Sequence, residues 1–531
     1  LKFGQLALSE SKGVFVKIGI DVGGTHTDAV VLSGTEILAS HKALTSADVK
    51  EGIVKALDAV MSSASLKPSD VSSVMIGTTH FTNAVIERKH LSPTAIIRAC
   101  LPTGTGIPPQ YDWPEDIANL LGNHIYSIKG GHTFSGDEIH SLDDGEIHSV
   151  IKDIAQKGIE SIAIAAAFSP MNPVHEVYLA NKIRAEMPSA NITLSHEIGR
   201  LGILERENAA LLNAALGTLA DAVVSSMKQA LLERQIDCPF YVSQNDGTLM
   251  SADYIARYPA LTFASGPTNS LRGAAMLSKI SDAIVVDIGG TTSDVGVLAN
   301  GFPRESNSFI DVGGIRTNFR MPDIMAIGVG GGSLVSADGK SVGPKSVGHR
   351  LVTESLVFGG NQITATDIVV AAGLETIGDT QKTSHLKPEM IKAANDEIHR
   401  KIDDAIDRMR PSDDPVPVIL VGGGSILVSQ KLNSASKIIC PEHAGVANAI
   451  GAAIAQVGGE VESIVSYSKI KREDAIAQIT QEAKAKAVLA GADGNFVRVL
   501  DVEETPMSYM DDNAVRLRIK VVGELKKLVK S

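Results

Sequence analysis

The chain has 531 residues, of which 44% are hydrophobic and 21% are charged, and its formal net charge is −12. This length predicts more than one hydrophobic core, and the composition excludes a disordered or fibrous protein. The negative charge argues against a partner held by counterion release, so we expect no nucleic-acid partner.

The cysteines and the apolar segments indicate a reducing compartment without a membrane span. Cys100, Cys238 and Cys440 are widely spaced and form no CxxC pair, which argues against a zinc knuckle, an iron–sulfur cluster or a disulfide framework. No uninterrupted apolar run reaches the roughly 18 residues of a membrane helix. Residues 1–12 lack the basic and apolar regions of a signal peptide. We therefore expect a cytoplasmic protein without a membrane segment.

The first predicted element is a β-hairpin that recurs in the second half of the chain. Residues 20–28 read Ile-Asp-Val-Gly-Gly-Thr-His-Thr-Asp, and residues 286–294 read Val-Asp-Ile-Gly-Gly-Thr-Thr-Ser-Asp. Each copy has an apolar run, a glycine turn and a second β-rich run, which is typical of a hairpin. Because both copies share the pattern D-x-G-G-T-x-[TS]-D, the repeat predicts two related halves.

The residues of these hairpins are suited to holding a polyphosphate. Glycines let phosphate oxygens approach backbone N–H groups, and threonine hydroxyls add donors. We predict Asp21 and Asp287 as metal ligands and catalytic carboxylates, because Mg²⁺ prefers oxygen ligands. A purely structural turn is the alternative, but it does not explain the shared Asp and Thr. The predicted nucleotide-binding residues of the hairpins are Gly23, Gly24, Thr25, Thr27, Gly289, Gly290, Thr291 and Thr292.

Between the hairpins, alternating helical and strand patterns predict α/β architecture. Residues 101–145, rich in Gly, Pro and His, predict irregular surface. His124, His132, His140 and His148 recur every eight residues, but this spacing does not keep one helical face, so a polar loop is favoured over a metal site. The predicted regular elements are an amphipathic helix at 51–61, strands at 71–76 and 162–168, and one long helix at 205–231.

Two polar groups next to these elements are candidate ligands for a substrate. Thr78, Thr79, Asn83 and Arg88 follow the strand at 71–76, and they could either enter a cleft or cap and solvate a helix that begins at Asn83. A second group, residues 205–208, opens the long helix. A carboxylate there is favoured by the helix dipole, so we favour a structural role for that group.

The second half adds two glycine clusters. Gly330, Gly331 and Gly332 have apolar flanks and predict close approach of the backbone to a ligand. Asp323 lies upstream as a candidate acid, base or metal ligand, or as a turn residue after proline. A buried strand at 417–421 leads into a further glycine turn, which could support a flat adenosine if a helix follows. The residues of that turn are Gly422, Gly423, Gly424 and Ser425.

The pattern changes after residue 463. A polar helix is predicted at 472–489, with strands at 496–502 and 515–522, and a linker at Gly458 and Gly459. We read this segment as a small α+β appendage. The predicted organisation is an N-terminal lobe with an inserted region (14–280), a second lobe (281–458) and the C-terminal appendage (463–531).

The order of hairpin, hairpin and glycine turn resembles the phosphate-1, phosphate-2 and adenosine motifs of the actin, sugar-kinase and acetate-kinase superfamily. More closely, the chain resembles the A-type subunits of the hydantoinase/oxoprolinase family over roughly residues 16–455. Two departures stand out: residues 321–325 read Met-Pro-Asp-Ile-Met where the family commonly has a histidine, and the C-terminal portion is short. Besides the hairpins, the resemblance is carried by residues 77–88, 197–200, 205–208, 265–267, 273–274, 327–333 and 342–344.

The resemblance implies two actin-like (ribonuclease-H-like) lobes around a nucleotide cleft, with ATP and Mg²⁺ as cofactors. It implies ATP-dependent opening of a cyclic amide such as a hydantoin, 5-oxoproline or lactam, through phosphorylation of the carbonyl, with a B-type partner subunit. We also expect a homo-oligomer. A small-molecule kinase, a ketone carboxylase subunit and a non-enzymatic ATPase switch are alternatives. The chain has no G-x-x-x-x-G-K-[ST] and no G-x-S-x-G motif, which argues against a P-loop enzyme and a serine hydrolase.

Overall fold

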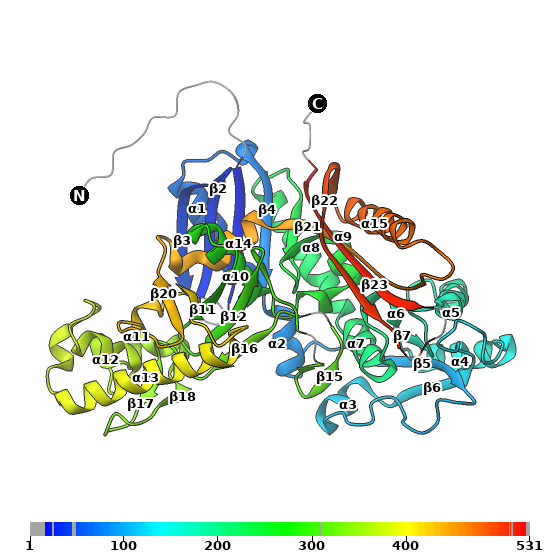
Figure 1. Ribbon diagram of the computed structural model, residues 1–531, viewed down its shortest axis with the longest axis horizontal. Coiled ribbons are helices and arrows are strands. Elements are labelled where there is room, and N and C mark those ends of the chain that lie inside the picture. Colours follow the sequence, from blue (N-terminus) through cyan, green and yellow to red (C-terminus); the bar gives the residue numbers. More distant parts are fainter. Residues whose placement is uncertain are drawn as a thin grey trace.

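The computed structural model describes residues 16–23, 26–44, 49–306, 309–319, 321–508, 510 and 513–526. This part of the chain has α/β architecture, built on two large mixed sheets and one smaller parallel sheet (Figure 1). In sheet order, the nine-stranded sheet consists of β22 (Ala492–Pro506), β23 (Ala514–Leu525), β21 (Gln456–Ser466), β10 (Thr248–Ser251), β9 (Phe240–Ser243), β4 (Val71–Thr78), β1 (Val16–Val22), β2 (His26–Ser33) and β3 (Glu36–Leu44).

The second large sheet repeats the centre of the first. In each sheet a hairpin, β1–β2 or β11–β12, is antiparallel, and its first strand pairs in parallel with β4 or β19. A further parallel strand follows in each, β9 or β20. The repeat in the sequence thus corresponds to a repeated strand arrangement. The second sheet consists of β13 (Phe302–Pro303), β12 (Ser293–Ala299), β11 (Ala283–Ile288), β19 (Val416–Val421) and β20 (Ala435–Ile439), with β16 (Ile324–Ile327) paired to β12.

Two helices pack against each other between the large sheets and fix their positions. Helix α14 (Ala447–Ile454) contacts β1, β2 and β4, whereas α10 (Ser265–Ser278) contacts β11, β12 and β19. Their backbones approach closely, because a Cβ at Gly273 would lie 1.9 Å from the Ala447 carbonyl oxygen, and a Cβ at Gly451 1.8 Å from that of Asn269. Glycine at these positions therefore sets the distance between the helices.

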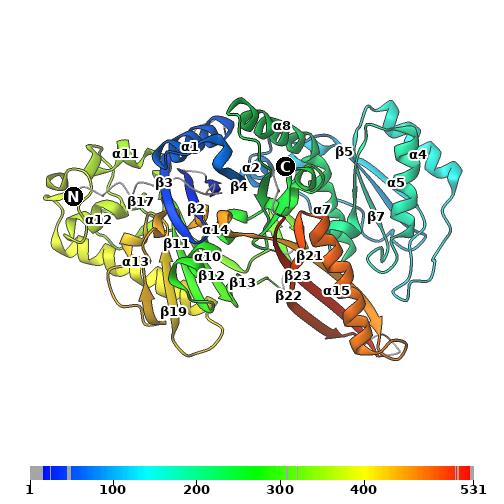
Figure 2. The same ribbon diagram turned by 90° about the horizontal axis from the view of Figure 1, so that it is seen from above.

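The inserted region is a parallel four-stranded sheet with helices against it. Consecutive buried residues form its central strand β7, as expected when both faces of a parallel sheet are covered. This region lies at the opposite end of the molecule from α12 (Ala365–Ala371) and α13 (Pro388–Met409) in both views (Figures 1 and 2). Its elements are β6 (His124–Lys129), β5 (Thr94–Leu101), β7 (Ser161–Ala166) and β8 (Asn191–Leu194), with α4 (Asp144–Gln156) and α5 (Val174–Glu186).

The long helix predicted at 205–231 is two helices in the structure. Helix α7 (Ile203–Ala215) and helix α8 (Gly217–Glu233) meet at an angle of 47°. Glycine has low helix propensity, which favours a break at Gly217. A Cβ at Gly217 would lie 1.5 Å from the side-chain nitrogen of Asn191, so glycine also allows this close approach. Within the described residues no single helix is long and apolar enough to cross a membrane, although this bent pair passes by length and composition alone.

Two other segments differ from their sequence predictions. Residues 101–145, predicted as irregular, include α3 (Glu115–Leu121) and β6. The predicted linker at Gly458 and Gly459 lies inside β21. A Cβ at Gly459 would lie 2.3 Å from the Ala483 carbonyl oxygen on α15 (Arg472–Leu489). These glycines allow close packing of helix on strand, and β21, β22 and β23 extend the first sheet rather than forming a separate appendage.

Candidate nucleotide site between the hairpins

A cavity of about 670 Å³ lies between the two glycine hairpins. Its walls come from both large sheets, from α10 and α14, and from the glycine turn that follows β19. The hairpins, which are far apart in the sequence, therefore border one space.

Four aspartates line this cavity, two from each hairpin. Asp21 lies directly opposite Asp28 in the β1–β2 register, and Asp287 lies directly opposite Asp294 in the β11–β12 register. Like charges placed opposite each other on neighbouring strands destabilise a sheet. The arrangement therefore requires cations or hydrogen-bond donors to compensate it.

The first pair is compensated by amides and a lysine. Asn269 Nδ2 donates to Asp21 Oδ1 over 3.1 Å, and Asn448 Nδ2 donates to Asp21 Oδ2 over 3.1 Å and to Asp28 Oδ2 over 2.8 Å. Lys42 Nζ lies 2.6 Å from Asp28 Oδ1. Burial, reinforced by the charges of Asp28 and Asp287, raises the pKa of Asp21 to about 6, although both amides act in the opposite direction.

The second pair has fewer partners. Ser270 Oγ donates to Asp287 Oδ2, and burial raises the pKa of Asp287. Burial and the charge of Asp287 together raise the pKa of Asp294 to about 7. No described residue donates a hydrogen bond to the Asp294 carboxylate or forms an ion pair with it. Among the described residues, no cation forms an ion pair with either carboxylate of the second hairpin, although the charge of Lys42 acts on Asp287 from a distance.

A glycine on the adjacent parallel strand makes room for the first aspartate of each pair. A Cβ at Gly77, next to Asp21 on β4, would lie 2.0 Å from Asp21 Oδ1. A Cβ at Gly422, directly after β19, would lie 2.3 Å from Asp287 Oδ1. The repeat thus extends to a third strand, a feature that the sequence comparison of the hairpins did not find.

Most of the predicted glycines border the cavity, but they do so in different ways. Gly331 N donates to the Gly289 carbonyl over 3.0 Å and Gly332 N to the Gly290 carbonyl over 2.7 Å, so the cluster at 330–332 packs on the second hairpin. Ser425 begins a single 3₁₀ turn, Ser425–Leu427, instead of the expected longer helix. The glycines that line the cavity are Gly23, Gly266, Gly289, Gly290, Gly331, Gly348, Gly422, Gly423, Gly424 and Gly445.

The predicted threonines of the hairpins do not contribute to the cavity wall in the described residues. Gly24 and Thr25 lie outside the described residues. Thr27 is fully buried within β2, and Thr291 and Thr292 are exposed at the turn. Thr27 therefore belongs to the buried part of the first hairpin, and Thr291 and Thr292 lie on the exposed turn of the second hairpin.

Of the candidate substrate ligands, only Thr79 lines the cavity, where its Oγ1 donates to the Val22 carbonyl over 3.3 Å. Thr78 is buried and accepts a hydrogen bond from the His80 backbone, and Asn83 lies on the exposed side of α2 (His80–Ile86). Arg88 donates to the backbone carbonyls of Val85 and Gly313 and pairs with Asp116, which is the arrangement of a structural residue.

Asp323 also lies apart from the cavity. Its carboxylate forms an ion pair with Arg304 at 2.6 Å, and its backbone N–H donates to the Arg304 carbonyl. These contacts hold the strand that leads into β16. The histidines at 124, 132, 140 and 148 do not assemble either, and no group of three His, Cys, Asp or Glu side chains within the described ranges is arranged to hold a metal ion.

Sequence reasoning missed several residues of this site. Asp28 and Asp294 end the repeated pattern, so the repeat itself could have identified them. Lys42, Asn269 and Asn448 have no comparable signal, because only the packing of β3, α10 and α14 brings them to the aspartates. The cavity wall also includes apolar side chains, which are those of Leu351, Val352, Phe358, Ile377 and Ile426.

The donor set is suited to Mg²⁺ held jointly with a polyphosphate. Mg²⁺ is usually bound through one or two carboxylates together with substrate phosphates and water, rather than by a complete protein cage. Burial raises the pKa values of Asp21 and Asp294 to about 6 and about 7, so the ionised form of both carboxylates is disfavoured without a cation. A divalent cation would supply the missing positive charge.

Comparisons with known proteins identify the family of the chain. The family model described as the hydantoinase/oxoprolinase N-terminal region matches residues 17–187, and the hydantoinase/oxoprolinase model matches residues 206–381. The chain is 25% identical to the caprolactamase subunit alpha of Pseudomonas jessenii over 385 residues, which cover 67% of this chain and 54% of that protein. It is 26% identical to the acetophenone carboxylase gamma subunit of Aromatoleum aromaticum over 236 residues, 42% of this chain and 32% of that protein.

The fold is also similar to a solved structure. The ATP-dependent caprolactamase from Pseudomonas jessenii superposes with a TM-score of 0.77 at 19% identity, covering 96% of this chain and 88% of that chain. The chain spans about one third to two thirds of the length of the curated relatives that it matches. The two family models together cover most of the chain, in the order that the motifs predict, and the chain belongs to the hydantoinase/oxoprolinase family.

Proposed function

We propose that this protein uses ATP to open a cyclic amide such as a hydantoin, 5-oxoproline or another lactam. The observation that carries the proposal is the pair of equivalent hairpins, each presenting two opposed aspartates to one cavity of about 670 Å³. In this proposal the two matched sheets form the halves of an actin-like nucleotide cleft. The glycine turns of both hairpins hold the phosphates through backbone N–H groups.

The adenosine end of the nucleotide is assigned to the turn after β19. Gly423 lines the cavity, and a Cβ there would meet nothing within 4 Å, so its backbone is open to a flat ring. The apolar side chains of Phe358 and Ile426 border the same space. A cavity lined by both apolar side chains and acidic, glycine-rich hairpins offers suitable surfaces for the two ends of ATP.

Asp21 and Asp287 are proposed to hold Mg²⁺, directly or through its water molecules. When bound, Mg²⁺ would neutralise the phosphates and the aspartates, which otherwise repel each other. Lys42 and the amides of Asn269 and Asn448 keep the first aspartate pair oriented. The protein's own contribution is therefore positioning and charge compensation, which is the main requirement of phosphoryl transfer.

The chemistry follows from the poor electrophilicity of an amide carbonyl. Transfer of the γ-phosphoryl group to the carbonyl oxygen breaks the terminal P–O bond, releases ADP and gives a phosphorylated imidate. Water then adds to the carbon, the C–N bond breaks with protonation of the nitrogen, and a second water releases phosphate from the carboxyl group. The products are ADP, phosphate and an open-chain amino acid or carbamoyl amino acid.

The ring-opening steps are assigned to a B-type partner subunit. The Pseudomonas and Aromatoleum relatives are named as subunits, which supports a multi-subunit enzyme. Within this chain, the described residues of the cavity include no cysteine, and its two histidines, His26 and His349, form no hydrogen bond or ion pair with an aspartate of the site. We propose that this chain activates the amide and that the partner completes its hydrolysis.

The decisive experiment is positional isotope exchange in ATP labelled with ¹⁸O at the β,γ-bridging position. Exchange requires reversible cleavage of the terminal P–O bond, so it reports phosphoryl transfer even without the partner subunit. We expect exchange with Mg-ATP and one ring of a panel of hydantoins, lactams and 5-oxoproline, and none with Asp287→Asn. Exchange that is independent of every ring, or stimulated only by sugars, would contradict the proposal.

A ketone carboxylase subunit is the second candidate, because the chain is 26% identical to an acetophenone carboxylase gamma subunit over 236 residues. The same assay includes acetophenone and bicarbonate as a separate arm. Exchange stimulated by the ketone or by bicarbonate, and not by a cyclic amide, would replace the amide proposal with carboxylation.

A further inference from the structure

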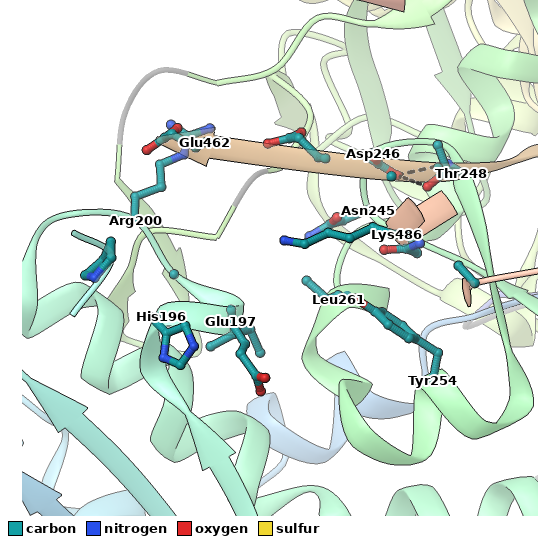
Figure 3. Close-up of a pocket in the computed structure, with 18 of the residues that line it drawn as sticks. His196, Glu197, Arg200, Asn245, Asp246, Thr248, Tyr254, Leu261, Glu462 and Lys486 are labelled. Carbon is teal, nitrogen blue, oxygen red and sulfur yellow. Dashed lines mark hydrogen bonds between the residues drawn. The ribbon is translucent and has the colours of Figure 1, made fainter. Parts of the chain in front are cut away.

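A second pocket, of about 310 Å³, lies outside the nucleotide site (Figure 3). It forms where the inserted region, the β9–β10 turn and the C-terminal elements β21 and α15 meet. It shares no lining residue with the cavity between the hairpins. Figure 3 shows His196, Glu197, Arg200 and Glu462 on one side of this space, and Asn245 and Tyr254 on the other.

Three buried polar atoms at this pocket have no hydrogen-bond partner in the described part of the chain. Asn245 is 3% exposed and Asn318 is 5% exposed, and both line the pocket. Among the described residues, no hydrogen-bond partner is present for Asn245 Nδ2, Asn318 Oδ1 or Arg200 Nε. A buried polar group without a partner destabilises a protein. Three of them around one pocket indicate that a ligand supplies the missing partners.

The positions of these groups are set by the surrounding backbone. Thr268 Oγ1 donates to the Asn245 carbonyl over 2.9 Å, which fixes the β9–β10 turn on α10. A Cβ at Gly199 would lie 2.7 Å from Asn318 Oδ1, so glycine allows Asn318 to approach the segment that carries Arg200. The amides are therefore held by the fold and are not free surface side chains.

Several carboxylates at the pocket already have a cation. Glu197 pairs with Arg257 at 2.6 Å, Asp246 with Lys520 at 2.8 Å, and Glu460 with Arg518 at 3.0 Å. Arg200 differs from the cations of these pairs, because its ion pair with Glu305 is longer, at 3.9 Å. Burial lowers the pKa of Arg200, although the charges of Glu462 and Glu305 act in the opposite direction. The pocket thus has a buried cation whose Nε has no hydrogen-bond acceptor among the described residues.

We propose that this pocket binds a small zwitterion that carries both a carboxylate and an ammonium group, which is the chemistry of an amino acid. Arg200 Nε and Asn245 Nδ2 are the donors for the carboxylate. Asn318 Oδ1 accepts from the ammonium group, and the carboxylates of Glu197 and Glu462, which line the same pocket, add favourable negative charge. The site is independent of the nucleotide chemistry, although α10 contacts both places: Thr268 holds the Asn245 backbone, and Asn269 donates to Asp21.

Calorimetric titration of the full chain tests this proposal. The probes are glycine, glutamate and 5-aminopentanoate, with pentanoate and pentylamine as compounds that have only one charged end. We expect at least one zwitterion to bind at least tenfold more tightly than both pentanoate and pentylamine, since neither can satisfy both sets of groups. Equal binding of pentanoate and the best zwitterion, or no binding of any zwitterion, would overturn the proposal.

Substitutions in the pocket test whether the zwitterion binds there. Arg200→Gln and Asn245→Ser are each expected to weaken the best zwitterion at least tenfold, whereas Arg400→Gln, which removes an exposed arginine on α13, leaves it unchanged. Arg200→Lys keeps the charge but not the Nε donor, and it serves if Arg200→Gln does not fold, as judged by thermal unfolding. Unchanged binding in the Arg200 and Asn245 variants, or loss of binding in Asp287→Asn, would place the ligand elsewhere and overturn the proposal.

Discussion

The two hairpins have the same sequence pattern but different electrostatic surroundings. In the first hairpin, two amides and Lys42 contact the aspartates. In the second, one hydroxyl contacts Asp287, and Asp294 has no hydrogen-bond or ion-pair partner in the described part of the chain. The comparison teaches that a repeated motif fixes where carboxylates lie, whereas the neighbouring helices decide how strongly each carboxylate needs a ligand cation.

The largest expected effect follows from replacing the metal-side aspartate of each hairpin. We expect Asp287→Asn to lower the rate of phosphoryl transfer by about 10³-fold or more, and Asp21→Asn to lower it less, because amides already share the charge of Asp21. The measurement is ADP release or isotope exchange at saturating Mg-ATP. Asp253→Asn, on an exposed side chain, is the matched control. Equal losses at the two positions would show that the hairpins are equivalent.

Removing the lysine should make the first hairpin resemble the second. Lys42→Met is expected to raise the KM for Mg-ATP about tenfold, which corresponds to about 1.4 kcal/mol. Burial raises the pKa of Asp287 and the charge of Lys42 partly offsets it, so the acidic limb of the pH–rate profile should move to higher pH. Lys42→Arg should restore most of the effect. An unchanged profile would exclude Lys42 from charge compensation.

Substitutions at Gly77 and Gly422, which lie beside Asp21 and Asp287, distinguish the effect of lost space from the effect of backbone strain. A Cβ at Gly77 or at Gly422 would collide with an aspartate oxygen, and Gly422 also has a positive φ of 83°. We expect Gly422→Ala to lower the free energy of unfolding by about 2–4 kcal/mol and Gly77→Ala by about 1–3 kcal/mol. Urea unfolding measures both. Gly423→Ala, where a Cβ meets nothing within 4 Å, is the control with little effect. A reversed order would show that the space beside Asp21 is the stricter requirement.

The smallest expected effect is on stability as a function of pH. Asp294 has a pKa raised from 3.8 to about 7, so the folded protein retains a proton that the unfolded chain has already released. The resulting stabilisation is fully present below pH 3.8 and is lost as the pH rises through about 7. Asp294→Asn should therefore raise the unfolding temperature of the nucleotide-free protein by about a few degrees at pH 7.5, and by less at pH 5. Thermal unfolding at the two pH values measures this difference.

Mg-ATP should show the opposite dependence on pH. Stabilisation by Mg-ATP is expected to increase between pH 5.5 and pH 8, because binding of the cation requires ionised carboxylates whose pKa values are about 6 for Asp21 and about 7 for Asp294. Thermal unfolding with and without Mg-ATP over this range measures the effect. A stabilisation that does not vary with pH would show that the aspartates are not the groups that titrate.

The sequence by itself determined the repeated hairpins, the positions of Asp21 and Asp287, and membership of the family. These features are local: a strand, a glycine turn and a carboxylate are encoded within a few consecutive residues, and a spaced repeat is visible without the fold. The helix at 472–489 and the strands at 496–502 and 515–522 were predictable for the same reason, because their periodicity is contained in the segment.

Only the tertiary structure decided which residues complete the site. Asn269 and Asn448 reach Asp21 because Gly273 and Gly451 let α10 and α14 pack closely, and Lys42 arrives from a third strand. The tertiary structure also determines that β21, β22 and β23 belong to the first sheet and that Asp323 and Arg88 form structural ion pairs. The physical reason is that compensation of charge and close packing depend on residues that are distant in the chain, and no local pattern records which of them will meet.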